Sequence, residues 1–171
     1  DPFQVLGAHA IESDDRRFIS IRAFLPMAER AWVVAEDGEL MPLERYEGTD
    51  LFEAQFPGAA LPFTYQIRTE DKDGQVHQGR DPYSFWPVLG DLDLQLFGEG
   101  NHYRTYQRLG AQLMVHDGAQ GVCFAVWAPN AQRVSVTGDF NGWDGRRHPM
   151  RARGSSGIWE LFIPGLREGA L

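Results

Sequence analysis

The sequence predicts an all-β protein made of two tandem immunoglobulin-like β-sandwich modules, the second lacking its final strand or strands. Three observations lead to this fold class. The apolar segments are short and alternate with polar residues, Gly, Pro and Asp interrupt them at roughly eight- to twelve-residue intervals, and one part of the chain repeats another. A length of 171 residues is enough for two small domains.

The internal repeat appears in three pairs of segments. Residues 6–9 (LGAH) return as residues 109–112 (LGAQ), and residues 20–30 return as residues 123–133, both at an offset of 103 positions. Residues 51–58 (LFEAQFPG) return as residues 158–165 (IWELFIPG) at an offset of 107 positions, so the second copy contains a four-residue insertion. We therefore expect an N-terminal module at 1–80, a connector at 81–108 and a second module at 109–171.

In the first module, alternation over residues 18–24 predicts one strand, and residues 62–68 predict a later one. Hairpin turns are expected at residues 36–39 (EDGE) and 71–74 (DKDG), where Gly supplies the positive φ of a tight turn. The second of these resembles the start of a calcium loop. The ligands that should follow are absent, so we interpret it as a turn.

The connector contains Pro and Gly but is rich in apolar residues over 85–97. A flexible linker is polar, so this segment is expected to pack against a folded module. Asn101 is expected to cap a short helix over residues 103–108 that ends at Gly110.

The second module is expected to contain a strand ending at Gly138, a tight turn at residues 141–142 and a hairpin turn at residues 154–157. The strand at 62–68 of the first copy has no counterpart after residue 165. An open sheet edge leaves backbone groups unpaired. We therefore expect the chain to be a fragment of a longer protein.

Composition narrows the range of functions. The net charge of −8 disfavours nucleic acid and anionic membranes as partners, and no stretch approaches the length of a membrane-spanning helix. The lone Cys123 lies in an apolar run, so a buried thiol in a reducing, cytoplasmic compartment is expected.

Sequence signals for catalysis or for a bound group are missing. The five histidines have no metal-ligand spacing, and no nucleotide-binding or nucleophile-elbow motif occurs. The paired carboxylates at 14–15 and 36–37 are expected in solvated turns, where nothing raises a pKa for acid catalysis. We expect no metal, no cofactor and no catalytic residue in this chain.

The segment 138–150 (GDFNGWDGRRHPM) has the composition of a carbohydrate site. The indole of Trp143 is suited to stacking on the apolar face of a glucose ring, while Asn141, Asp144 and Arg147 supply groups for its hydroxyls. The alternative is that Trp143 fills the core and Arg147 only pairs with Asp144.

Residues 140–150, preceded by 124–131 (FAVWAPNA) and followed by 157–165, closely resemble the family 48 carbohydrate-binding module of bacterial glycogen branching enzymes. Residues 1–9 (DPFQVLGAH) and 79–85 (GRDPYSF) resemble the extra N-terminal module of the longer members of that family. Together these resemblances cover essentially the whole chain.

The resemblance implies that the full protein cuts α-1,4-glucan chains and rejoins them through α-1,6 links. The catalytic carboxylates of the family belong to a (β/α)₈ domain that would follow Leu171, so this chain alone is expected to be inactive. Its expected partners are α-1,4-glucan or glycogen and that catalytic domain, and Trp143 takes the glucan-binding role of the family's Phe-Asn-x-Trp motif.

Two alternatives remain at this point. One is a stand-alone glycogen-binding targeting module, which would not need a duplicated module. The other is the N-terminal part of a debranching enzyme, a class that generally lacks the run at 143–150 (WDGRRHPM).

Overall fold

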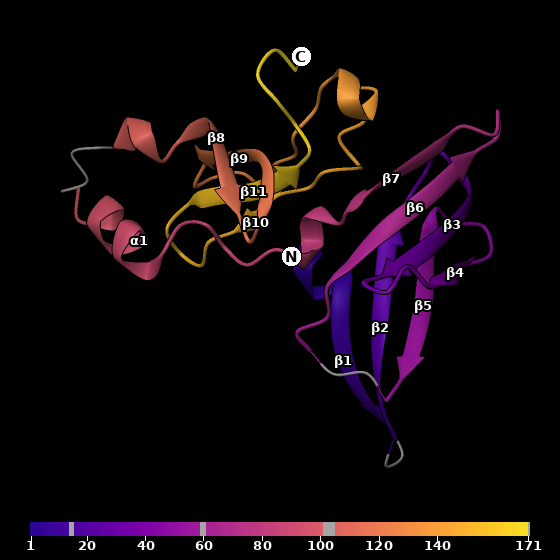
Figure 1. Cartoon of the computed structure of the whole chain (residues 1–171). Coiled ribbons are helices and arrows are strands. Elements are labelled where there is room, and N and C mark those ends of the chain that lie inside the picture. The colour runs from indigo at the N-terminus through magenta and orange to yellow at the C-terminus, as the bar shows by residue number, and fades with distance from the viewer. Residues whose placement is uncertain (14–15, 59–60, 101–104, 171) are drawn as a thin grey trace. The chain divides into compact units, whose positions relative to one another are not determined.

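The computed structural model describes residues 1–13, 16–58, 61–100 and 105–170, and strands predominate in them (Figure 1). The strands are β1 (Gly7–Ser13), β2 (Arg16–Phe24), β3 (Ala28–Ala35), β4 (Leu40–Arg45), β5 (Leu51–Pro57), β6 (Tyr65–Asp71), β7 (Val76–Arg80), β8 (Gly110–His116), β9 (Ala119–Trp127), β10 (Arg151–Ala152) and β11 (Ile158–Pro164). The helical segments are η1 (Pro2–Gln4), η2 (Pro82–Ser84), α1 (Asp91–Gly98), η3 (Thr105–Gln107) and η4 (Asp139–Asn141). All strand pairs are antiparallel, which confirms the predicted all-β class.

The chain divides into two compact units. One comprises Phe3–Ser84, and the other comprises Phe85–Leu171 with Asp1–Pro2. No helix in the described ranges is long and apolar enough to cross a membrane.

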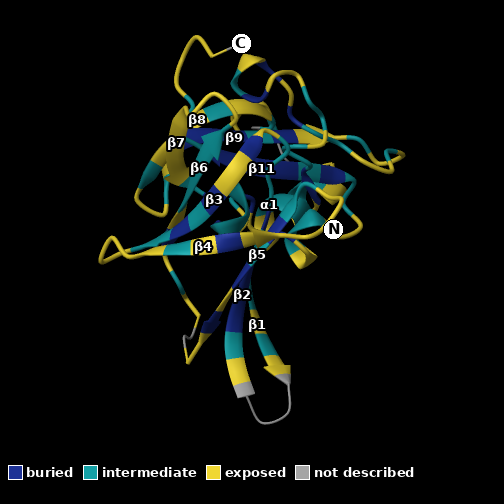
Figure 2. Ribbon diagram, turned by 90° about the vertical axis from the view of Figure 1, so that its right-hand side faces the viewer, coloured by how far each residue is buried: buried dark blue, intermediate teal, exposed yellow. Residues whose placement is uncertain are grey.

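The first unit is one hydrogen-bonded sheet in the order β1-β2-β5-β4-β3-β6-β7, folded over on itself. The two halves share a single core. It contains Ile19, Ile21, Ala28, Ala31, Val33, Leu43, Phe52, Ala54, Phe56 and Tyr65. Buried and exposed positions alternate along β5, as expected for a strand with one face on the core (Figure 2). The fold of this unit is therefore a β-sandwich.

The predicted turns of the first unit are confirmed. Gly38 has a φ of 85° and its amide donates to the Ala35 carbonyl, closing the hairpin between β3 and β4. In the turn between β6 and β7, the Asp71 carboxylate accepts the amides of Asp73 and Gln75, both at 2.9 Å. Asp71 thus caps a turn, as the sequence interpretation held. The expected turn at residues 14–15 lies outside the described residues.

The second unit contains a four-stranded sheet in the order β10-β11-β9-β8. Its central pairing repeats that of the first unit. Gly110 faces Ala125 as Gly7 faces Arg22, and Ile158 faces Trp127 as Leu51 faces Phe24. Each pair keeps the offsets read from the sequence, so the predicted duplication is confirmed at the level of strand register.

The two copies also share backbone conformation at their matching glycines. Gly7 and Gly110 open equivalent strands with φ values of 90° and 89°. Gly58 and Gly165 end equivalent strands with φ values of 75° and 82°. Since these conformations strongly favour glycine, the repeat has retained it where the fold requires it.

The copies differ after this shared core. Residues 134–138, predicted as a strand, form only an isolated bridge between Ser135 and Pro149. In the first unit the equivalent β3 has β4 on one side and β6 on the other. Among the described residues of the second unit no strand takes the place of β6, so residues 134–138 lack the second partner that makes β3 regular.

The connector also differs from expectation. Its regular helix is α1, at Asp91–Gly98, which the sequence interpretation did not identify. Asn101, the expected cap of a helix over 103–108, lies outside the described residues, and η3 covers Thr105–Gln107. As expected, the connector packs on a folded module: Phe85 and Leu89 are buried against strands β9 and β11 of the second unit.

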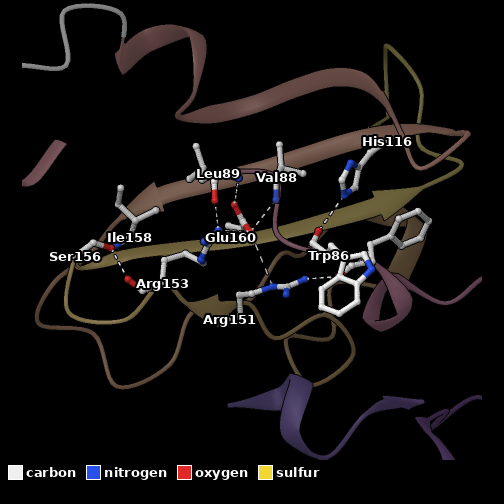
Figure 3. A network of polar contacts seen from close by, with 10 residues as sticks. Trp86, Val88, Leu89, His116, Arg151, Arg153, Ser156, Ile158 and Glu160 are labelled. Carbon is white, nitrogen blue, oxygen red and sulfur yellow. Dashed lines mark hydrogen bonds and ion pairs between the residues drawn. The ribbon is translucent and has the colours of Figure 1, made fainter. Parts of the chain in front are cut away.

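A buried polar cluster fastens the connector to that sheet (Figure 3). The Glu160 side chain on β11 is 1% exposed and accepts the backbone amides of Val88 (3.1 Å) and Leu89 (2.9 Å). The Arg153 guanidinium donates to Glu160 (2.8 Å) and to the Leu89 carbonyl (2.6 Å). Arg151 donates to the Phe85 carbonyl at 2.7 Å. From Phe85 onward, the described part of the connector therefore folds with the second unit, whereas residues 81–84 belong to the first.

The two ends of the first unit lie against each other. The rings of Phe3 and Tyr83 form an edge contact with centroids 5.0 Å apart. A Cβ added at Gly7 would lie 2.7 Å from the Tyr83 carbonyl oxygen, so the backbone approach there depends on glycine.

Candidate carbohydrate-binding site

The candidate site lies in residues 134–150, which connect β9 to β10 and are drawn in orange in Figure 1. Two backbone hydrogen bonds close the base of this segment: the Val136 amide donates to the His148 carbonyl (3.0 Å), and the Met150 amide donates to the Val134 carbonyl (2.9 Å). Val136 and Met150 are buried. The loop thus projects from a base that is fixed to the core.

The tip of the loop is a tight turn with unusual backbone geometry. Gly142 and Trp143 adopt consecutive left-handed conformations, with φ values of 62° and 59°. Gly adopts this conformation freely, whereas a non-Gly residue in a sparsely populated region costs about 1–3 kcal/mol. Such strain is concentrated at functional sites. The strained residue here is the Trp that the sequence singled out.

The indole of Trp143 is presented to solvent. The residue is 64% exposed, and its Nε1–H donates to Asp139 Oδ1 at 2.8 Å. This hydrogen bond fixes the orientation of the ring while the faces of the ring remain free of the core. The alternative in which Trp143 fills the core is therefore wrong.

Asn141 holds the loop together from inside. The residue is 1% exposed, and its Oδ1 accepts the Gly138 amide at 2.9 Å. Its Nδ2 donates to the Val136 carbonyl and to His148 Nδ1, both at 2.9 Å. Because its donors and acceptor are used within the loop, Asn141 supports the turn that carries Trp143 instead of facing solvent.

His148 is matched to this role. Burial, together with the positive charge of Arg147, lowers the pKa of His148 from 6.5 to about 4. The imidazole is therefore neutral near neutral pH, and its Nδ1 is able to accept the hydrogen from Asn141. The ring also contacts Phe140, with centroids 5.6 Å apart.

Asp144 is paired with Arg146. The Arg146 guanidinium donates to both carboxylate oxygens, at 2.7 to 3.1 Å, and the Arg146 amide also donates to Asp144 at 2.9 Å. These hydrogen bonds from Arg146 lower the pKa of Asp144 from 3.8 to about 2. Arg147 is half-buried, and burial lowers the pKa of its guanidinium. Asp144 thus forms a hydrogen-bonded ion pair with Arg146, and its charge also acts on Arg147.

The structure places the four sequence-predicted residues in one loop, although in different settings. Trp143 is exposed, Asp144 and Arg147 are partly exposed, and Asn141 is buried. Sequence reasoning missed Asp139, which orients the indole, and His148, which anchors Asn141. The spacing of Asp139 four residues before Trp143 was the available signal.

The chain matches two protein families. Residues 1–83 match the family described as alpha-1,4-glucan branching enzyme GlgB, N-terminal domain. Residues 108–171 match the family described as carbohydrate-binding module 48 (isoamylase N-terminal domain).

Curated relatives match over the whole chain. The 1,4-alpha-glucan branching enzyme GlgB of Paramagnetospirillum magneticum is 51% identical over 171 residues, and that of Methylococcus capsulatus is 52% identical over 171 residues. The chain is covered completely in both cases and spans 22% of the length of each relative.

Among solved structures, PulA from Klebsiella pneumoniae is 17% identical, with a TM-score of 0.26, over 94% of this chain and 17% of that one. A likeness at this level supports no inference.

Proposed function

We propose that the chain serves as the non-catalytic N-terminal part of a glycogen branching enzyme. Residues 1–83 match the N-terminal domain family of 1,4-alpha-glucan branching enzymes, and residues 108–171 match the carbohydrate-binding module 48 family. The complete protein then transfers α-1,4-glucan segments into α-1,6 branches through a catalytic (β/α)₈ domain that follows this chain. Relatives about 50% identical across all 171 residues favour this function over a stand-alone targeting module or a debranching enzyme.

The contribution of this chain is α-glucan binding. The observation that carries it is the exposed Trp143 indole, fixed by Asp139 and displayed on a strained turn. The flat ring stacks on the apolar C–H face of a glucose unit, and the nearby Asp144 and Arg147 side chains hydrogen-bond to its hydroxyls. Asn141 positions the turn. We also propose a cytoplasmic location, which the single buried thiol of Cys123 supports.

Titration of the 171-residue chain with maltoheptaose tests the site. Replacing Trp143 with Ala should weaken binding about fivefold, the scale of a lost stacking contact. The matched control is Trp86→Ala, which removes a still more exposed indole outside the loop and should leave the affinity unchanged. Equal affinities of the Trp143→Ala variant and the unchanged chain would refute the stacking role.

The chain alone should not process glucan. The absorbance of an amylose–iodine complex should stay constant in its presence, because the chain lacks the catalytic domain. A decrease that depends on this chain would contradict the assignment of catalysis to another part of the protein.

A further inference from the structure

The first unit differs from the second on one corresponding face of its sheet. The repeat aligns Glu53 on β5 with Glu160 on β11, and both strands pair in the same register with β2 and β9. In the second unit, this face holds Cys123 and Phe162, which are covered by the connector residue Phe85. The corresponding residues of the first unit are Ser20 and Gln55. The face that is apolar and covered by Phe85 in the second unit is therefore polar in the first unit.

A cleft of about 460 Å³ opens beside Glu53, where β4 and β5 separate. These strands pair only through Glu44 with Glu53 and Arg45 with Phe52, and β4 then continues along β3. The cleft is lined by Met41, Pro42, Glu44, Arg45, Tyr46, Glu53, Ala54 and Gln55. Its volume falls within the range of small-molecule sites.

The lining combines an aromatic ring with several hydrogen-bonding groups. Tyr46 is 44% exposed, and its hydroxyl donates to Glu53 Oε2, which orients the ring. Glu53 also accepts the Arg22 guanidinium at 3.1 Å and the Ser20 hydroxyl. Tyr46 is therefore held by a carboxylate as Trp143 is held by Asp139.

Two glutamates that line this cleft are cross-strand neighbours. Glu44 lies directly opposite Glu53 in the antiparallel register, and Glu44 and Gln55 are exposed. Like charges at such positions destabilise a sheet. Because Glu53 is occupied by Ser20, Arg22 and Tyr46, the exposed Glu44 carboxylate and Gln55 amide are the groups at this cleft that a ligand can hydrogen-bond.

We propose that this cleft is a second α-glucan site, in which Tyr46 stacks on a glucose unit and Glu44 and Gln55 accept or donate hydrogen bonds to its hydroxyls. The inference rests on the proposed function, from which it takes the ligand class. The polar groups that line the cleft suit a ligand rich in hydroxyls. An extended peptide would instead require apolar positions such as those that bury Phe85 in the second unit.

The test is a maltoheptaose titration of the ¹⁵N-labelled 171-residue chain carrying Trp143→Ala, which disables the loop site. Amide signals of residues 41, 43–46 and 53–55 should shift in a saturable manner, and Tyr46→Ala should weaken this response about fivefold. Val76→Ala is the matched control because Val76 is similarly exposed in the same unit and lies outside the cleft. Unchanged signals elsewhere in the first unit verify that each variant is folded, and Tyr46→Phe, which keeps the ring, should retain most of the affinity.

The two sites succeed or fail separately in this design. Shifts confined to residues 138–148 in the chain with Trp143 intact would overturn the second site while supporting the loop site. Shifts confined to residues 41–55 would support the second site and refute the loop site. The second site is also overturned by an absence of shifts, or by an equal response to cellohexaose, whose β-linked chain has a different shape.

Discussion

Replacing Glu160 with Gln removes the only acidic side chain in the described cluster that fastens the connector to the second unit. Glu160 is 1% exposed and Arg153, its partner at 2.8 Å, is 11% exposed, so both groups are withdrawn from water. Removing one partner of a buried ion pair costs about 3–5 kcal/mol, because the other charge stays buried without compensation. The Gln side chain also has a single oxygen for the amides of Val88 and Leu89, which now occupy two.

The loss is measurable by urea unfolding followed through Trp fluorescence. Trp86, Trp127, Trp143 and Trp159 belong to the second unit and only Trp32 belongs to the first, so the signal reports mainly on the second unit. With a slope of about 1–3 kcal/mol per M, the midpoint should fall by at least about 1 M.

Asp93→Asn is the matched control for this experiment, because Asp93 lies in the same unit as Glu160 and is more exposed. Its 3.3 Å pair with Arg108 lies near the surface, with side chains 22% and 47% exposed, and such pairs contribute about 0–1 kcal/mol. If Glu160→Gln lowers the stability by no more than Asp93→Asn does, the argument that the connector depends on this cluster is refuted.

Four other expectations follow from the geometry. The Trp143→Gly variant should be more stable than the Trp143→Ala variant by about 1 kcal/mol in thermal unfolding. Both variants lack the indole, but only Gly adopts the left-handed backbone conformation at residue 143 without strain. Equal stability of the two variants would show that the turn is unstrained. Gly121→Ala should destabilise the second unit by roughly 1–3 kcal/mol, since the new Cβ would lie 2.4 Å from the Ile163 carbonyl oxygen, while Gly79→Ala, which meets nothing within 4 Å, should have little effect. Acidification should have opposite effects on the stability of the two units. The pKa of His148 in the folded state is lowered to about 4, so the second unit loses up to about 3 kcal/mol of stability as the pH falls from 6.5 to 4. Burial raises the pKa of Asp81 to about 6, so the first unit gains up to about 3 kcal/mol of stability as the pH falls from 6 to 3.8. Amide exchange in each unit, with His148→Gln and Asp81→Asn removing the respective effects, checks both signs. A chain continued beyond residue 171 with the parent sequence should show slower amide exchange over 134–138, and unchanged exchange would mean that no strand pairs there.

Much of the strand architecture was predictable because the same pattern of strands and turns occurs in both copies of the repeat. The offsets of 103 and 107 positions identify the equivalent strands of the two units, so the register of a pair in one unit implies the register of the equivalent pair in the other, and Gly7 and Gly110 mark the same point in each copy. Helix α1 was missed because Leu92, Leu94 and Leu96 alternate with polar residues, a pattern typical of a strand. Packing of Leu94 and Phe97 on the sheet overrides this local pattern.

The loop at 138–150 was identified from composition, but its internal contacts were not predictable from residue types. The hydrogen bonds of the Asp144 carboxylate to Arg146 form because the turn directs the Arg146 amide and guanidinium to the same carboxylate. The Glu160 cluster joins residues 71 and 72 positions apart, and no local sequence pattern signals a contact at that distance.

The meeting of Phe3 and Tyr83 has a consequence for how such a protein is assembled in evolution. When the two ends of a domain lie close together, the domain can be inserted into or removed from a longer chain without moving the residues that flank it. The first unit has this property, because its ends meet in the ring contact of Phe3 with Tyr83 and in the close approach of Gly7 to the Tyr83 carbonyl. The same geometry makes it suitable for transplantation into a surface loop of an unrelated protein, where adjacent termini impose no strain on the recipient.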